Sequence, residues 1–240
     1  MKYSLDNAVF TYFMGSKRLL EFSNYININS KLCLNYSDKT QCLYETYSDI
    51  SVLVLGFCID SRNEIEQSDL CLFIYEMFSL GRENLLRECD RFAGNYTIFI
   101  FSQEESESIA FTDAVGLMQL NFYSDRENKA FSSHPSLISK YLSLGCSAKA
   151  HKISLGARKE TSPLPYNITD FEKVYVVLPN HYLNINEMQC KRYWPNDKTK
   201  ETRSNVDSLE SVLERTYERI KNISKIYAKS YSLSCALTGG

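Results

Sequence analysis

Residues that break regular structure are scarce in this sequence: 9 of its 240 residues are glycine and 5 are proline. This composition argues against a linker-rich or disordered chain. Long apolar runs are also missing, since no stretch approaches the roughly 18 consecutive apolar residues of a membrane-spanning helix. The first residues lack the charged, apolar and small-residue regions of a secretory signal. We therefore expect a globular protein of the cytoplasm that does not bind a membrane.

An excess of charge of one sign is absent too. The 27 basic and 29 acidic residues give a formal charge of −2, so the composition predicts no nucleic-acid partner. The 8 cysteines form no Cys-x-x-Cys pair, and some, such as Cys58 and Cys71, lie in apolar runs where a reduced cysteine packs as a small apolar side chain. Reduced thiols are therefore favoured over a disulfide framework. The three histidines, His134, His151 and His181, are too scattered to predict a metal site.

What the chain does contain is a long series of strand and helix patterns. Apolar, aromatic and β-branched residues predict strands over 9–13, 51–55, 95–101, 109–112, 118–123 and 129–132. Helical spacing of apolar residues, with Gly81 as a C-cap and Pro135 in a first turn, predicts helices over 68–80, 82–88 and 135–142.

Less regular segments follow the third helix. Residues 145–168 are predicted to be irregular. Two short strand patterns, 172–178 and 181–185, predict a hairpin around the dipeptide Pro179-Asn180. The polar stretch at 195–204 is typical of a linker.

The last part of the chain predicts one helix and one strand. The helix covers 205–228 and begins at a capping-box pattern, and the strand is the apolar run that ends at Leu237. The apolar stripe of the helix is predicted to pack into a core and not to form a recognition face; it comprises Val206, Leu209, Leu213, Ile220 and Ile223. Many strands followed by a separate helix and strand favour an α+β domain and the opening of an α/β domain.

The run Leu237-Thr238-Gly239-Gly240 follows the predicted strand directly. Glycines after a strand let the backbone approach an anion closely, and many phosphate-binding loops begin in this way. An ordinary turn is the alternative interpretation of the same four residues.

Five segments in order resemble the N-terminal part of asparagine synthetase and its relatives, which carry a class II glutamine amidotransferase domain. In the first segment, family positions are matched by Asp69, Gly81, Phe92 and Ala93, while Asp90 stands where the family has glycine. Residues 112–116 resemble the family's Arg-Asp-x-x-Gly motif, and residues 131–134 resemble its Ala-Ser-Glu motif. Residues 178–194 resemble its Pro-Gly hairpin with a Tyr-Trp pair, and residues 237–240 resemble the start of its pyrophosphate loop. The resemblance covers roughly residues 50 to 240.

The resemblance implies a fold and a domain organisation. Residues 1–194 would form an α+β domain, a four-layer αββα sandwich of two stacked antiparallel sheets of the N-terminal-nucleophile amidohydrolase type. A linker at 195–204 would lead to the start of an ATP-pyrophosphatase-type synthetase domain at 205–240.

The implied activity is that of an ATP-dependent, AMP-forming amide-bond ligase. The complete protein would use ATP and Mg²⁺, with Leu237, Thr238, Gly239 and Gly240 as the beginning of the ATP site, whereas this chain alone would hold no cofactor. The expected partners are a downstream synthetase domain and a carboxylate substrate, either aspartate or a peptide or small acid, and the family also allows a homodimer. Relatives without the N-terminal cysteine, such as β-lactam synthetase and lasso-peptide cyclases, take the amine from the substrate itself.

Two departures from the family concern the glutaminase. The family nucleophile is a cysteine directly after the initiator Met, activated by its own amine, but this chain begins Met1-Lys2-Tyr3-Ser4 and its first cysteine is Cys33. The family's Asn-Gly-Glu, which forms the oxyanion hole, is replaced by Leu55-Gly56-Phe57. Losing one oxyanion donor costs about 10²–10³ in rate. We therefore expect no catalytic residues and no glutaminase activity.

What remains of the glutamine site is predicted at Asp69 and Gly56. Asp69 is interpreted as a helix cap in preference to a ligand anchor, and Asp113 and Gly116 as residues that shape a turn.

Two hypotheses stay open. The chain is either the N-terminal part of an asparagine-synthetase-like ligase or a non-catalytic amidotransferase-like module for docking or structure. Whether it is an enzyme, and whether it is a fragment or a true short product, would be decided by the reading frame beyond codon 240.

Overall fold

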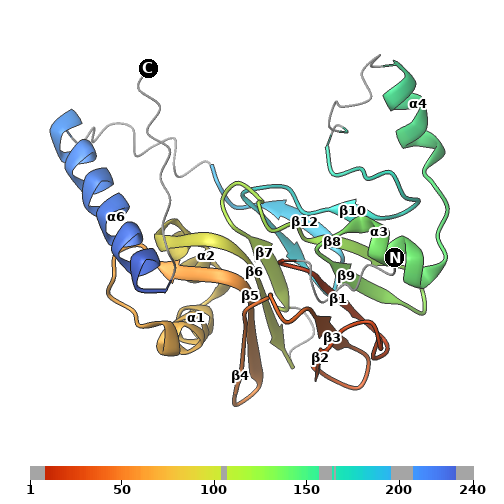
Figure 1. Ribbon diagram of the computed structural model, residues 1–240, viewed down its shortest axis with the longest axis horizontal. Helices are drawn as coiled ribbons and strands as arrows, with labels where there is room; N and C mark the ends of the chain where they lie inside the picture. Colours follow the sequence, from red (N-terminus) through yellow and green to blue (C-terminus); the bar gives the residue numbers. More distant parts are fainter. Residues whose placement is uncertain (1–8, 104–106, 157–163, 165, 196–207, 231–240) are drawn as a thin grey trace. The chain divides into compact units, whose positions relative to one another are not determined.

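A computed structural model describes residues 9–103, 107–156, 164, 166–195 and 208–230. The chain divides into two units (Figure 1). The sandwich unit comprises Met1–Phe57 and Asn95–Trp194, and the helical unit comprises Cys58–Gly94 and Pro195–Gly240. The predicted limits at residues 194 and 204 stay predictions.

Sheet A of the sandwich unit has six strands in the order β10-β8-β9-β1-β3-β2, and neighbouring strands are antiparallel. Its strands are β1 (Tyr12–Gly15), β2 (Asn24–Asn27), β3 (Cys33–Tyr36), β8 (Asn121–Ser124), β9 (Lys129–Ser132) and β10 (Tyr175–Val176). β1 therefore lies between β3 and the much later β9.

Sheet B also has six strands, in the order β12-β11-β7-β6-β5-β4. Its strands are β4 (Cys42–Tyr47), β5 (Ile50–Asp60), β6 (Phe92–Ser102), β7 (Ile109–Thr112), β11 (His181–Asn184) and β12 (Gln189–Arg192). The predicted strand at 51–55 is confirmed as part of β5, which has neighbours on both sides and is buried along almost its whole length.

An apolar cluster between the two sheets forms the core of the sandwich unit. The ring of Phe99 from β6 meets the rings of Tyr12 and Phe131 from sheet A edge to face, with centroids 6.1 Å and 5.6 Å apart. Each fully buried side chain of this size contributes about 1.5–3 kcal/mol to stability. The two sheets are therefore stacked face to face, as the resemblance implies.

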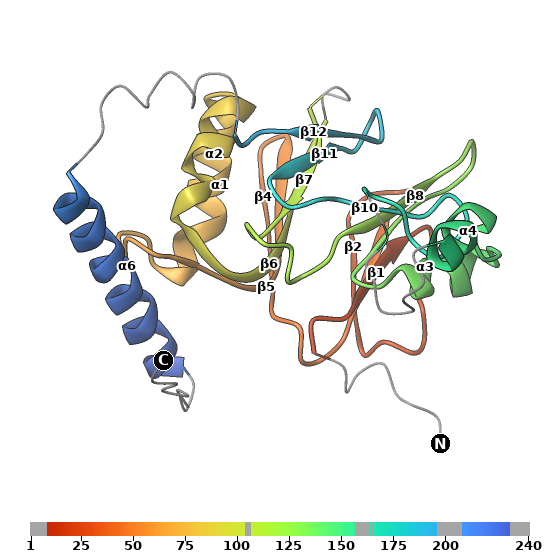
Figure 2. The same ribbon diagram turned by 90° about the horizontal axis from the view of Figure 1, so that it is seen from above.

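The outer face of sheet A is covered by α3 (Pro135–Leu142) (Figure 2). Leu137 and Ile138 of the helix pack with Phe13 and Tyr123 of the sheet in a second apolar cluster. Pro135 stands in the first turn, as predicted. The predicted mixed α+β architecture is thus confirmed for two antiparallel sheets and one helical layer.

The helical unit contains α1 (Leu70–Ser79), α2 (Arg82–Glu88) and α6 (Leu209–Ser230). Gly81 joins α1 to α2 with a φ of +116° and donates its N–H to the Phe78 carbonyl, which confirms the predicted glycine stop. Phe73 of α1 packs edge to face on Phe92, with ring centroids 6.2 Å apart.

The predicted hairpin around Pro179-Asn180 is wrong. β10 pairs with β8 in sheet A, whereas β11 pairs with β7 and β12 in sheet B. The dipeptide forms a turn, with φ of +61° at Asn180, but this turn carries the chain from one sheet to the other. The true hairpin joins β11 to β12, and its turn is held by the Asn184 side chain, which accepts the N–H groups of Asn186 and Glu187 at 2.9 Å each.

The predicted irregular segment contains a helix that the sequence pattern did not indicate, α4 (Ala148–Gly156). The hydroxyl of Ser147 accepts the N–H of Ala150 at 3.2 Å and so caps its first turn. The weak apolar periodicity of this short helix explains why the pattern did not reveal it.

The apolar stripe of α6 is not a core within the described part of the chain, so that prediction is wrong. Leu209, Leu213 and Ile220 are 74%, 58% and 59% exposed. Val206 lies outside the described residues, and Ile223 is half-buried. Periodicity shows that a helix has an apolar face but does not show where the partner of that face lies.

Candidate functional site

Gly56 is the predicted glutamine-site residue in the sandwich unit, and its surroundings leave it no free donor. Its N–H donates to the carbonyl of Gln41 at 2.8 Å and thereby continues the pairing of β4 with β5. The preceding residue, Leu55, is fully buried in the core between the sheets. An oxyanion hole of the family type needs a backbone N–H and a side-chain amide as donors. Here the Gly56 N–H is already bound to Gln41, and Leu55 stands in place of the amide.

Close packing explains why this position is glycine. Gly56 has a φ of +84°, and a Cβ atom there would lie 2.2 Å from the carbonyl oxygen of Asn95 and 2.6 Å from the sulfur of Met118. Both neighbours belong to the sandwich unit. The glycine is thus required by backbone geometry, whatever the chemistry of the site.

Asp69, the other predicted site residue, belongs to the helical unit and is exposed. It occupies the N-cap position of α1, but its carboxylate makes no capping hydrogen bond to the first turn. It accepts a hydrogen bond from the hydroxyl of Ser68 at 3.3 Å. Asp69 therefore stands at the N-cap position, as predicted, but its side chain does not cap the helix.

Asp113 shapes a turn, as predicted. Its buried carboxylate accepts the N–H groups of Val115, Leu117 and Met118 at 3.0–3.2 Å. Gly116, with a φ of +68°, donates its N–H to the Asp113 carbonyl at 3.0 Å. The carboxylate is fully occupied by the backbone of its own turn, so its role is structural.

The remaining predicted site residues lie outside the described part of the chain. These are the first four residues, where the family nucleophile would stand, and the loop formed by Leu237, Thr238, Gly239 and Gly240. Their assignments stay predictions.

Hydroxyl groups do gather around the start of β1, but the backbone holds them. Ser132 donates its hydroxyl to the carbonyl of Tyr12 at 2.7 Å, and the hydroxyl of Ser133 accepts the Tyr12 N–H at 3.1 Å. Tyr12 itself donates to the carbonyl of Gln119, and burial raises the pKa of its phenol. A serine nucleophile needs an adjacent base, and the hydrogen bonds seen here run to backbone atoms instead.

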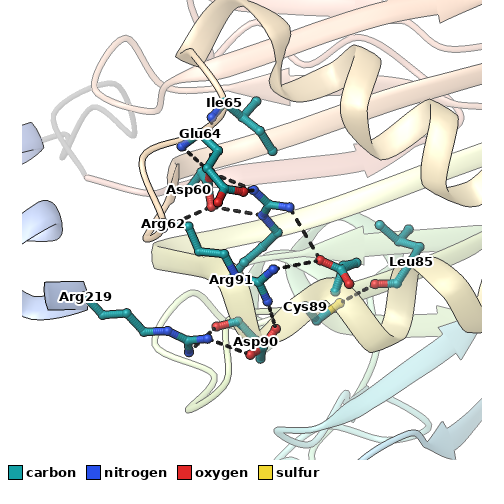
Figure 3. A network of polar contacts seen from close by, with 10 residues as sticks. Asp60, Arg62, Glu64, Ile65, Leu85, Cys89, Asp90, Arg91 and Arg219 are labelled. Atoms are coloured by element: carbon teal, nitrogen blue, oxygen red, sulfur yellow. Dashed lines mark hydrogen bonds and ion pairs between the residues drawn. The ribbon is translucent and has the colours of Figure 1, made fainter. Parts of the chain in front are cut away.

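A network of ionic side chains connects several elements in the described part of the helical unit (Figure 3). Arg91 donates two parallel hydrogen bonds to the Asp60 carboxylate, from Nε at 3.0 Å and from Nη2 at 2.9 Å. Both side chains are buried, with 7% and 0% of their surfaces exposed. Bidentate guanidinium–carboxylate pairs are among the strongest ionic contacts in proteins.

The Asp60 carboxylate is satisfied on both oxygens. Burial alone would raise its pKa, but the hydrogen bonds from Arg91 and from the N–H groups of Glu64 and Arg62 outweigh burial, so the pKa is lowered. Arg91 also reaches Glu64 at 2.9 Å and Glu88 at 3.4 Å. The pair is therefore ionised and fully partnered, which suits a structural role and leaves no acid or base free for catalysis.

Asp90 connects this cluster to α6. Its carboxylate forms ion pairs with the guanidinium groups of Arg62, at 3.0 Å, and of Arg219 in α6, at 2.9 Å (Figure 3). The side chain of Asn222 donates to the Arg62 carbonyl at 3.4 Å. The residue that stands where the resembling family has glycine is thus an anchor for the C-terminal helix.

A cavity of about 610 Å³ lies at the end of the sandwich unit formed by the β2–β3 and β8–β9 turns and the ends of β6 and β11. The ammonium group of Lys129 in its wall donates to the carbonyls of Ile185 and Asn186 at 3.0 Å and 3.4 Å. Asp125 holds the β8–β9 turn, and the hydrogen bond from the Tyr123 hydroxyl, with those from backbone N–H groups, lowers its pKa to about 2. Lys129 and Asp125 therefore both hydrogen-bond to turns at this end of the sandwich unit.

In the described ranges, no three His, Cys, Asp or Glu side chains gather as metal ligands. No helix of those ranges is long and apolar enough to cross a membrane. The seven cysteines that the structure describes are not joined in disulfides.

The search of solved structures finds similar chains, whereas the two searches by sequence find none. No family model matches the chain, and no curated protein matches its sequence. Among solved structures it is similar to the glutamine phosphoribosylpyrophosphate amidotransferase from B. subtilis complexed with ADP and GMP, at 10% identity and a TM-score of 0.46. It is also similar, at 12% identity and a TM-score of 0.46, to a structure described as the allosteric regulatory enzyme of purine biosynthesis. Each match covers 80% of this chain and 45% of the other, so the chain spans less than half of their length.

Proposed function

We propose that this chain is an amidotransferase-like module that does not release ammonia from glutamine. One observation carries the proposal: the Gly56 N–H, at the position that the sequence resemblance assigns to the oxyanion hole, is bound to the carbonyl of Gln41. With Leu55 in the position of the amide donor, a tetrahedral intermediate would find neither of the two donors of the resembling family at this point of β5.

We further propose that the complete protein is an AMP-forming ligase that obtains its amine from free ammonia or from its own substrate. The support is the sequence resemblance over roughly residues 50 to 240, including the run Leu237–Gly240. ATP and Mg²⁺ would act at the synthetase domain, and the substrate would be a carboxylate such as aspartate or a small or peptide acid. The module would then serve as a scaffold for that domain.

The first test measures ammonia release from glutamine by the purified chain, with an active glutaminase as positive control. The expected result is release equal to the buffer blank at every glutamine concentration. Release above the blank that scales with protein concentration and survives repurification would contradict the proposal.

The ligase half is tested separately, on the product of the full reading frame. AMP formation from Mg-ATP is measured with a panel of carboxylic acids, with either ammonium or glutamine as the amine source. AMP formation supported by ammonium or by the acid's own amine, and not by glutamine, supports the proposal. The absence of AMP formation with every acid would favour the non-catalytic docking module.

A further inference from the structure

The cavity at the turns of the sandwich unit is separate from the predicted glutamine site. Ser16, which directly follows β1, lines the cavity, whereas the family nucleophile would precede β1 in the chain. Gly56 does not line it. Its volume of about 610 Å³ falls within the range of about 300–1,000 Å³ of cavities that hold small organic molecules.

Three cationic side chains line this cavity: Lys31 of the β2–β3 turn, Arg126 of the β8–β9 turn and Lys129 at the start of β9. None of the three forms an ion pair with a described carboxylate. Lys129 is half-buried, and its ammonium group donates to the carbonyls of Ile185 and Asn186, which leaves one of its three N–H groups for another acceptor. An anion in the cavity would supply the counter-charge that a partly buried cation needs.

The two acidic residues of the cavity wall, Asp125 and Glu127, are placed differently. The Asp125 carboxylate accepts the N–H groups of Glu127 and Asn128 at 2.8 Å and 2.7 Å and the hydroxyl of Tyr123 at 2.7 Å, so its own turn occupies both oxygens. Glu127 is exposed, and its carboxylate forms no ion pair with a described residue. Glu127 is therefore the acidic group with a free carboxylate that opposes an anion here.

Apolar side chains complete the wall. Leu32 and Ile185 are buried, and Phe101 is half-buried. Small-molecule sites typically combine such apolar surface with a few polar groups that fix the orientation of the ligand. The cavity thus offers a cationic side and an apolar side to one ligand.

We propose that this cavity binds a small organic anion, whose carboxylate or phosphate group contacts Lys129 and Arg126 and whose apolar body packs against Phe101. Guanidinium and ammonium groups form strong, charge-assisted hydrogen bonds with both kinds of anion. The proposal concerns the sandwich unit alone and does not depend on the ligase or on the loss of glutaminase activity.

Calorimetric titration of the chain in a phosphate-free buffer tests the site. The probes are phenyl phosphate and phenylacetate, one for each anionic group, and the neutral control is 2-phenylethanol. At least one of the two anions is expected to bind at a single site, about tenfold or more tighter than 2-phenylethanol, because the charged contact accounts for the difference. The anion that binds more tightly identifies the group that the site prefers.

Variants of the wall assign the binding to this cavity. Lys129→Met should weaken the binding of the preferred anion about tenfold, since a charge-assisted hydrogen bond is lost. Glu127→Gln should tighten it about twofold, because an opposing exposed charge is removed. The matched control is Lys39→Met, at an exposed lysine of the same unit that does not line the cavity, and it should leave the affinity unchanged.

Three outcomes would overturn the proposal. The first is that neither anion binds to a chain that circular dichroism shows to be folded. The second is equal binding of 2-phenylethanol and the anions, which would identify a purely apolar site. The third is unchanged anion affinity in Lys129→Met or, if that variant does not fold, in Arg126→Ala at its exposed turn position, which would place the bound anion elsewhere on the chain.

Discussion

In the sandwich unit, aromatic rings from two sheets meet in a buried apolar cluster, whereas in the helical unit the chain buries a guanidinium group against a carboxylate. Apolar packing depends little on pH or salt, while an ion pair depends on the charge of both partners. Within the helical unit the contacts also differ, because Asp60–Arg91 is buried but Asp90–Arg219 is exposed. The two units should therefore respond differently to mutation, pH and ionic strength.

The largest loss of stability is expected from Phe99→Ala in the sandwich unit. Phe99 is fully buried and contacts the rings of Tyr12 and Phe131. Truncating a buried phenylalanine costs about 3–5 kcal/mol in the free energy of unfolding, which denaturant titration measures. The matched control is Leu20→Ala, at an 89% exposed position, which should change little.

Asp60→Ala is expected to cost about 3 kcal/mol, because Arg91 would stay buried without its bidentate partner. The value lies at the lower end for a broken buried pair, since Glu64 and Glu88 still contact Arg91. The double variant D60L/R91M should recover much of the loss, because apolar replacement of a buried ion pair is often neutral. If the double variant is less stable than Asp60→Ala, the ion pair contributes more to the free energy of unfolding than two apolar side chains in its place.

The pH dependence of stability follows from the lowered pKa of Asp60. Because the folded-state pKa lies below the unfolded value of about 3.9, the stabilisation is fully present above that value and is lost as the pH falls through the folded-state pKa. Unfolding free energies measured from pH 7 downward should therefore drop below about pH 4. Asp60→Asn should flatten this part of the curve, and an unchanged curve in that variant would assign the acid sensitivity to other carboxylates.

The smallest effect is expected at the exposed pair of Asp90 and Arg219. Their coupling energy, from the double-mutant cycle of Asp90→Ala and Arg219→Ala, should be about 0.2–1 kcal/mol and should shrink as salt is added. Hydrogen exchange of the α6 amides provides the readout, since losing the anchor should speed exchange in this helix. A coupling that is independent of salt would mean that the contact does not act through its charges.

The sequence predicted elements whose patterns are local. The strands 109–112 and 129–132 and the helices 82–88 and 135–142 have the limits of β7, β9, α2 and α3. Each carries its own apolar periodicity or its own stop and start residue. Such information is complete within about a dozen neighbouring residues.

Pairing between distant segments could not be read in the same way. β12 has the sequence Gln-Cys-Lys-Arg, which shows no apolar alternation, so its hairpin with β11 was missed. Asp60 and Arg91 lie 31 residues apart, and no spacing rule connects them. At the candidate site, the sequence resemblance assigned Gly56 to the remnant of the glutamine site. That its N–H donates to the Gln41 carbonyl follows from the pairing of β4 with β5, which the sequence did not show.

The position of β1 has a consequence for synthesis on the ribosome. Its β3 neighbour is made soon afterwards, but its other edge is closed by β9, and the Tyr12 N–H binds a hydroxyl 121 residues further along the chain. At translation rates of about 5–20 residues per second, that edge waits roughly 6–24 s for its partner. During this interval the nascent chain exposes an unpaired strand edge, the kind of surface on which chains join one another. A pause in translation before residue 132 would lengthen the exposure, and we expect it to lower the yield of folded protein.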